Sequence, residues 1–407
     1  MNGNGKLPLE GIKVVDLTWV MVGPMAIRYL ADWGATVVHV ESATHVDTAR
    51  TIQPFKDSQP GPERSGLYQN VNAGKLGLTL NLNTEHGCAV LRRLIEWADI
   101  LAESYTPGIT ARWGFDYAHV REINPSIIML STCLAGQTGP NARFPGYGTM
   151  GAAFAGFIDM AGWPDRSPAG PFGAYTDYVA PKFIASALLA ALDHRRRTGR
   201  SQYIDLSQAE ASMHFLGPAL LDYMVNGRVV TRAGNADPGA APHGVYPCAG
   251  EDTWVAVAVT NDAQWHALCA ATGHTDWLTD PQFDTFLDRR ANAAGLDAEL
   301  SEWTRQSSPQ DVESLLQAHG IPASAVQTSA DCFLDSQLQS RGHFAEAQHP
   351  DLGAIPLETS RIRMSRSVPR TPAAAAMFGQ HNEQVLKDVI GMTDEEIVEL
   401  TVAGALE

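Results

Sequence analysis

The chain of 407 residues is poor in cysteine, in basic residues and in long apolar runs. Its five cysteines are scattered and form no CxxC pair, which argues against a disulfide framework and against a thiolate zinc site. The chain has 29 lysines and arginines and 45 acidic residues. The resulting net charge of −16 disfavours nucleic acid and anionic membranes as partners. The longest near-continuous apolar stretch, residues 183–192, is about half of what a membrane span requires.

The rest of the composition is ordinary for a globular protein. The chain is 44% hydrophobic and 18% charged, with a mean hydropathy of −0.13, and its length suits two domains. Met1 to Lys6 lacks the apolar core of a signal peptide. The 13 histidines include no HExxH motif and no ligand cluster that indicates a metal site. We therefore expect a cytoplasmic two-domain protein without a metal.

The first 40 residues have the pattern of a βαβ unit. Strands are expected at residues 13–18 and 36–41, with a helix over residues 25–33 that follows Gly23 and Pro24. A connection this short implies parallel strands in a layered α/β sheet. Four more strands are expected at residues 76–82, 99–103, 127–131 and 203–206, and a helix capped by Thr84 at residues 85–98.

The pattern changes after about residue 225. Two short β-runs, residues 244–248 and 254–259, flank Gly250, Glu251 and Asp252, which is typical of a hairpin. Helical patterns follow, so a smaller α+β domain is expected. Near the end of the chain, the run TDEE at residues 393–396 predicts a capping box at the start of a helix.

Two motifs could bind phosphate but have a more ordinary interpretation. Residues 146–151 match GxGxxG, yet no strand precedes them, so a glycine-rich loop packed close to a neighbouring segment is favoured over a dinucleotide site. The run HRRRTGR at residues 194–200 is more typical of the solvated end of a helix, where cations suit the helix dipole. The residues alone thus indicate a two-domain α/β protein and no particular reaction.

Longer motifs, taken in order along the chain, resemble the class III CoA-transferases. The family includes formyl-CoA, carnitine-CoA and benzylsuccinate CoA-transferases, with α-methylacyl-CoA racemases as relatives. The resemblance lies in residues 7–41, 75–82, 98–117, 123–131, 136–140, 194–211, 241–265 and 379–391. It implies a large Rossmann-like CoA-binding domain from residues 1–220 and 340–407, a small α+β domain over 225–335, and an interlocked, ring-like dimer.

The resemblance places the family's catalytic aspartate at Asp177, in the run AYTDYVAP. Taken alone, an aspartate at the start of a helix is typical of an N-cap. A carboxylate in that place is also held ionised by the helix dipole, which suits a nucleophile. The resemblance implies that Asp177 attacks an acyl-CoA thioester and carries CoA as an aspartyl-CoA thioester to a free carboxylic acid. Succinyl-CoA is a donor to test.

The same resemblance implies contacts with coenzyme A, which enters as the acyl-CoA substrate. The matching positions are Val20, Met21, Val22, Arg50, Lys75, Ser104, Tyr105, Ile109, Arg112 and Tyr147. Arg112 suits the CoA phosphates because a guanidinium is a permanently charged fork. The chain departs from the family at His39 and Ser42, where basic residues are usual, and at Met21, where formyl-CoA transferases carry glutamine. The last departure argues against oxalate and formate as substrates.

Two alternatives remain beside the homodimeric transferase. The first is an α-methylacyl-CoA racemase, which moves an α-proton between two bases. Those relatives carry a histidine in a G-H-D motif where this chain has Gly146, Tyr147 and Gly148. The second is a heteromeric CoA-transferase, of which this chain would be the active subunit because Asp177 is present. In each case the expected ligands are an acyl-CoA and a carboxylic acid, without nucleic acid, membrane or metal.

Overall fold

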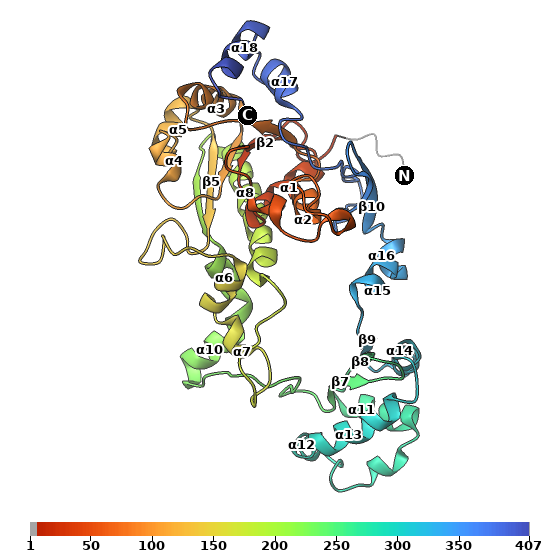
Figure 1. The fold of residues 1–407 in the computed structure, drawn as a ribbon. Coiled ribbons are helices and arrows are strands. Elements are labelled where there is room, and N and C mark those ends of the chain that lie inside the picture. The colour runs from red at the N-terminus through yellow and green to blue at the C-terminus, as the bar shows by residue number, and fades with distance from the viewer. Residues whose placement is uncertain (1–5, 407) are drawn as a thin grey trace. The chain divides into compact units, whose positions relative to one another are not determined.

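The computed structural model describes residues 6–406, and the chain divides into two compact units, each described here by itself (Figure 1). The larger unit is made of Met1–Ile158, Gly170–Val229 and Gln337–Glu407, and the smaller one of Asp159–Ala169 and Val230–Ser336. Of the opening segment interpreted above, only Lys6 lies within the described residues. Across residues 6–406, no helix combines the length and the apolar character that crossing a bilayer would need.

A six-stranded parallel sheet forms the centre of the larger unit, which confirms the α/β class and all six strands expected there. Its order is β3-β2-β1-β4-β5-β6. The strands are β1 (Lys13–Leu17), β2 (Thr36–Glu41), β3 (Leu76–Thr79), β4 (Ile100–Glu103), β5 (Ile128–Cys133) and β6 (Tyr203–Ser207). The order reverses between β1 and β4. In doubly wound folds, ligands bind beyond the carboxyl ends of the strands at such a switch point.

Helices cover both faces of this sheet. Because side chains alternate along a strand, Val14 of β1 packs into one core and Val15 into the other. The first core is closed by α1 (Val22–Asp32) and α8 (Tyr175–Thr198). The second is closed by α3 (Glu85–Trp97), α5 (Tyr117–Ile123), a π-helical turn (Val385–Val389) and α18 (Asp394–Val402).

Most helix ends lie where the sequence predicts them. The Thr84 side chain caps α3, and Thr393 forms the predicted capping box with Glu396. Helix α8 ends in arginines before a left-handed Gly199, so the HRRRTGR run is a helix end. Helix α1 differs, because it begins at Val22 and not at residue 25. Pro24 still lies in its first turn, where the missing N–H has no helical partner to lose.

Shorter elements complete the larger unit. Residues 344–358 form an antiparallel hairpin. The remaining elements are α2 (Gly66–Val71), α4 (Ile109–Arg112), α6 (Gly148–Phe154), α9 (Gln208–Met213), α10 (Gly217–Asn226), β10 (Phe344–His349), β11 (Gly353–Glu358) and α17 (Asn382–Gln384). Helices α7 (Phe157–Met160) and α16 (Ser336–Ser340) span the sequence boundaries between the units.

The smaller unit has an antiparallel sheet in the order β7-β8-β9, and its first two strands form the predicted hairpin. Stacked indoles of Trp265 and Trp277, with ring centroids 5.8 Å apart, lie in its core beside Phe283. The elements are β7 (His243–Pro247), β8 (Trp254–Ala258), α11 (Asp262–Thr272), α12 (Phe286–Ala291), α13 (Ala293–Thr304), α14 (Pro309–Ala318), β9 (Ala323–Ala325) and α15 (Ser329–Leu334).

Candidate active site

The chain leaves β1 through a tight turn at the switch point of the sheet. The Trp19 N–H donates to Ser104 Oγ, just beyond β4, at 3.0 Å. The turn closes so tightly that a Cβ at Gly23 would lie 2.6 Å from Thr18 Cγ2, so only glycine fits there. Helix α1 starts directly after the turn without a side-chain cap from Met21. Its dipole therefore favours negative charge at this edge of the sheet.

A cavity of about 330 Å³ opens over this turn and contains Asp177. Its walls come from the segments that follow β1, β4 and β5 and from the starts of α6, α8 and α9. Most of the lining residues are apolar, and the polar ones are Ser104, Thr106, Thr132, Cys133, Tyr147, Asp177 and Gln208. A carboxylate thus faces a cavity in which little else carries charge.

Asp177 lies in the first turn of α8, and not at the N-cap as one interpretation of the sequence expected. The N-cap residue is Ala174, and Asp177 as a whole residue is 6% exposed. Its Oδ1 accepts a hydrogen bond from the side-chain amide of Gln208, the first residue of α9, and the Gly148 N–H also bonds to the carboxylate. Three helices thus meet at this one group.

The glycines of the GxGxxG match allow this close approach. A Cβ at Gly148 would overlap the carboxyl group of Asp177, and one at Gly151 would lie 2.6 Å from Thr176 Oγ1. Thr176 Oγ1 in turn donates to the Gly148 carbonyl at 3.0 Å. The motif therefore packs α6 against the first turn of α8, as the more ordinary interpretation expected.

Burial raises the pKa of Asp177 to about 6, although the hydrogen bonds from Gln208 and Gly148 act to lower it. Removal of the carboxylate from water thus changes its pKa more than these two hydrogen bonds do. Near pH 7 the group is still mostly ionised. A carboxylate that has lost much of its hydration is a better nucleophile than one in water.

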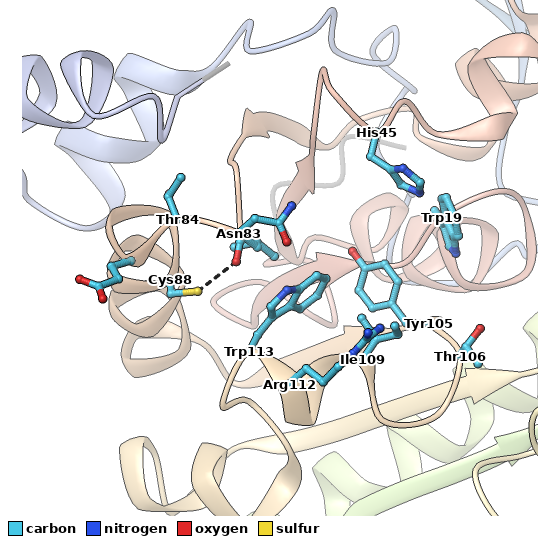
Figure 2. Close-up of a pocket in the computed structure, with 12 residues that line it drawn as sticks. Trp19, His45, Asn83, Thr84, Cys88, Tyr105, Thr106, Ile109, Arg112 and Trp113 are labelled. Atoms are coloured by element: carbon cyan, nitrogen blue, oxygen red, sulfur yellow. Dashed lines mark hydrogen bonds between the residues drawn. The ribbon is translucent and has the colours of Figure 1, made fainter.

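A second cavity has a volume of about 820 Å³ (Figure 2). Figure 2 shows Arg112 and Ile109 of α4 on its wall, together with the rings of Trp19, Tyr105 and Trp113. The Tyr105 and Trp113 rings meet edge to face with centroids 5.3 Å apart. Trp19 and Thr106 line both cavities, which therefore meet at the turn after β1. One cation and several flat apolar rings suit a ligand with a phosphate and an aromatic base.

The structure brings together most of the residues that the resemblance implied. Those in the cavity of Asp177 are Val20, Met21, Val22, Ser104 and Tyr147, and those in the larger cavity are Tyr105, Ile109 and Arg112. Arg50 and Lys75 line neither cavity. Arg50 bonds to the buried Glu41 and the partly exposed Glu63 at 2.8 and 2.7 Å, and Lys75 bonds to the buried Asp16 at 2.8 Å.

Several residues of the site were not predicted, among them Trp19, Gln208 and Gly148. Trp19 directly precedes the predicted Val20, so the turn itself could have indicated it. Gln208 lies in the family-like run SQAEA, and Gly148 lies in the GxGxxG match. Each lay within a motif that had been noted, but only the fold reveals that Gln208 and Gly148 contact Asp177.

One buried trio has the composition of a metal site. Ligand atoms of His39, Glu41 and Asp47 lie within 4.8 Å of one another. Both oxygens of Glu41, however, already accept hydrogen bonds from Arg50, at 2.9 and 2.8 Å. A second cation beside that guanidinium would be repelled, so the trio fits a metal poorly.

Comparison with known proteins finds similarity along nearly the whole chain. The model of CoA-transferase family III matches residues 9–382. The succinate–glutarate CoA-transferase of Agrobacterium fabrum is 33% identical over 388 residues, covering 95% of this chain and 96% of that protein. The succinyl-CoA–D-citramalate CoA-transferase of Chloroflexus aurantiacus is 28% identical over 393 residues, covering 97% and 96%. A crystal structure of a CaiB/BaiF family protein from Brucella suis has a TM-score of 0.86 at 31% identity, covering 95% and 100%.

The raised pKa of Asp177 predicts how an uncharged substitute changes stability. A group whose pKa is higher in the folded than in the unfolded state contributes stability at low pH that is lost as the pH rises through the folded value. Asp177→Asn should therefore match the wild type near pH 4 and become more stable as the pH rises through about 6. The gain should reach at most about 3 kcal/mol, since one pKa unit corresponds to about 1.4 kcal/mol.

Urea unfolding of both proteins between pH 4 and 8 measures this difference. Asp159→Asn, at an exposed aspartate elsewhere in the chain, is the control for the general effect of removing one negative charge. A stability difference that stays constant across this pH range would contradict the desolvation of Asp177.

Proposed function

The chain belongs to CoA-transferase family III, and we propose on that premise that it moves CoA from an acyl-CoA donor to a free carboxylic acid, with Asp177 as the nucleophile. The observation that carries the proposal is the desolvated Asp177 carboxylate in a cavity that adjoins a larger one bearing Arg112. Two relatives have succinate or succinyl-CoA in their names, so succinyl-CoA is the donor to test first.

The reaction proceeds in four balanced acyl transfers. Asp177 attacks the carbonyl carbon of the donor thioester, whose C–S bond breaks, so that CoA leaves as its thiolate and an aspartyl mixed anhydride is formed. The thiolate attacks the aspartyl carbonyl, which forms an aspartyl-CoA thioester and releases the donor acid. The acceptor carboxylate attacks that thioester, which gives a second mixed anhydride and again the thiolate. The thiolate then attacks the acceptor carbonyl, so that acyl-CoA leaves and the Asp177 carboxylate is restored.

The larger cavity would bind the nucleotide end of CoA, and the cavity of Asp177 would bind its thioester end. Arg112 would bind phosphate, and the rings of Tyr105 and Trp113 would pack against the adenine. The pantetheine arm would pass Trp19 and Thr106, which line both cavities, and so deliver the thioester to Asp177. The start of α1 would favour the negative charge of each tetrahedral intermediate. We propose that Arg50 and Lys75 support this site from the interior, without contact with CoA.

The racemase alternative is less favoured by the cavity. A racemase needs a second base opposite the first. Among the described residues that line the cavity, no histidine or further carboxylate accompanies Asp177. Cys133 lines it too, but burial raises the pKa of that thiol to about 11, which leaves it protonated near neutral pH.

We further propose that two copies form the interlocked dimer that the resemblance implies. Support comes from helix α10, which has no buried residue although it is rich in apolar side chains. Leu221, Tyr223, Met224 and Val225 of this helix are 58–78% exposed in the isolated chain. A face of this kind is typical of an interface. A partner of another sequence, as in a heteromeric transferase, is the alternative occupant.

The Asp177→Ala and Asp177→Asn variants test the nucleophile. Both should lose roughly 10³-fold or more of CoA transfer from succinyl-CoA to a panel of carboxylic acids, because neither side chain forms the covalent adduct. Wild-type protein treated with succinyl-CoA and then hydroxylamine should lose activity and carry a hydroxamate at Asp177, detected by mass spectrometry.

Near-wild-type transfer by Asp177→Asn would refute the covalent role. Exchange of the α-proton of a 2-methylacyl-CoA for deuterium, without transfer to any acid, would favour the racemase instead.

The pH dependence of turnover follows from the same carboxylate. Log kcat/KM should rise with pH through about 6, because only the ionised Asp177 attacks. Gln208→Leu removes a hydrogen bond that lowers the pKa of Asp177, so its inflection should move to higher pH. Glu103 is a second carboxylate whose pKa burial raises, to about 7, so it could give a similar inflection. The Glu103→Gln variant is therefore the control. An inflection that moves in Glu103→Gln and stays in Gln208→Leu would contradict the assignment.

The proposed dimer predicts the mass in solution. Because an interlocked assembly cannot separate without unfolding, sedimentation velocity at nanomolar concentration should give twice the chain mass of 43.8 kDa. A single species of 44 kDa that transfers CoA would contradict the dimer. An inactive 44-kDa species would instead support the heteromeric alternative.

A further inference from the structure

Val20 has an unusual backbone conformation for its residue type. Its φ is 65°, in the left-handed region, although it is β-branched. Within residues 6–406, the other non-glycine residues with positive φ are Asp57, Ser58 and Asp252, and none of them is β-branched. A β-branched residue in this region is a strained outlier that persists only where its surroundings hold it.

Asp47 is the residue that holds Val20. Its Oδ1 accepts the Val20 N–H at 2.9 Å, across 27 residues of sequence, and also the Ala49 N–H at 2.9 Å. Asp47 is 4% exposed and caps a short 3₁₀ helix, Thr48–Thr51, in the loop beyond β2. The preceding N–H of the turn, that of Trp19, is taken by Ser104. Two consecutive N–H groups are thus fixed by side chains from two other loops.

The turn that is fixed in this way forms one wall of the candidate active site. Val20, Met21 and Val22 line the cavity that contains Asp177, and α1 begins at Val22. If Val20 relaxed to an ordinary extended conformation, the chain after it would leave β1 in another direction. Met21, Val22 and the start of α1 would then be displaced relative to Asp177.

We propose that Asp47 is a positioning residue, whose carboxylate fixes the strained backbone of Val20 and thereby places the Trp19–Val22 turn against Asp177. The inference rests on the proposed function, because its kinetic readout is CoA transfer. It differs from a plain capping role in one respect. We call the hydrogen bond from the Val20 N–H to Asp47 Oδ1 the clamp. Loss of a helix cap costs the same stability and activity whatever residue stands at position 20. Loss of the clamp costs more when that residue tolerates a positive φ poorly, as valine does.

Glycine at position 20 separates the two roles, because it adopts a positive φ without steric cost. The experiment compares Asp47→Ala, Asp47→Asn, Val20→Gly and the double variant Val20→Gly/Asp47→Ala with the wild type. Asp47→Ala should lower kcat/KM for succinyl-CoA roughly 30-fold, mainly through kcat, because the reacting groups are misplaced. Asp47→Asn keeps an acceptor oxygen and should stay within roughly 3-fold of the wild type. In the Val20→Gly background, Asp47→Ala should cost less than about 5-fold.

Asp116 provides a matched control. Its Oδ1 accepts the same kind of main-chain pair, from Ala118 and His119 at 2.9 and 3.2 Å, as the N-cap of α5. Asp116→Ala should leave kcat/KM unchanged with either residue at position 20. Equal losses for Asp47→Ala in both backgrounds would overturn the clamp, and so would an Asp47→Asn as impaired as Asp47→Ala.

The urea midpoints of the same variants keep the clamp testable if no acid accepts CoA, an outcome that would refute the proposed function alone. Asp47→Ala should lower the midpoint more in the presence of Val20 than in the Val20→Gly background. Equal shifts would overturn the clamp. If Asp47→Ala does not fold, the double variant should fold again, and its failure to do so would also overturn the clamp.

Discussion

The candidate site depends on keeping one carboxylate out of water. Asp177 is wedged between a glycine of α6 and the first residue of α9, and its burial outweighs the hydrogen bonds that favour its charged form. This arrangement costs stability whenever the group is ionised, and the same loss of hydration makes the carboxylate reactive. The glycine at position 148 follows from this requirement, because any side chain there would occupy the place of the carboxyl group. Stability and reactivity are thus set by the same contact.

Ion pairs in the interior join residues in or beside the strands of the parallel sheet. Asp16, at the end of β1, bonds to Lys75 and to His39, and these two groups lower its pKa although its burial raises it. Arg50 joins Glu41 of β2 to Glu63, and its guanidinium lies 3.6 Å from the ring centre of Tyr68. Buried pairs of this kind add little net stability, but removal of one partner costs about 3–5 kcal/mol because a charge is left unpaired. This cost gives Arg50 and Lys75 a structural role in the interior, although neither residue lines a cavity.

Local pattern predicted the elements well and their contacts poorly. Apolar runs located all six strands of the parallel sheet, and the capping residues Thr84 and Thr393 located two helix starts. The start of α1 was missed by three residues, because Pro24 fits several positions in a first turn equally well. Asp177 was expected at an N-cap and lies inside the first turn, because α8 already begins at Tyr175 with Ala174 as its N-cap. The CoA contacts and the interlocked dimer implied by the resemblance remain predictions.

The α/β class, the parallel direction of the sheet and the family could be inferred from the amino-acid sequence, because each depends on residues that are close together in the chain or on motifs in a fixed order. The contacts that set the reactivity of the site could not be inferred in this way. The contact between Asp177 and Gln208 spans 31 residues, the clamp on Val20 spans 27, and the bond from Trp19 to Ser104 spans 85. The raised pKa of Asp177 and the strained φ of Val20 are consequences of these long-range contacts. Burial and backbone strain are decided only when distant segments pack, so the tertiary structure alone could reveal them.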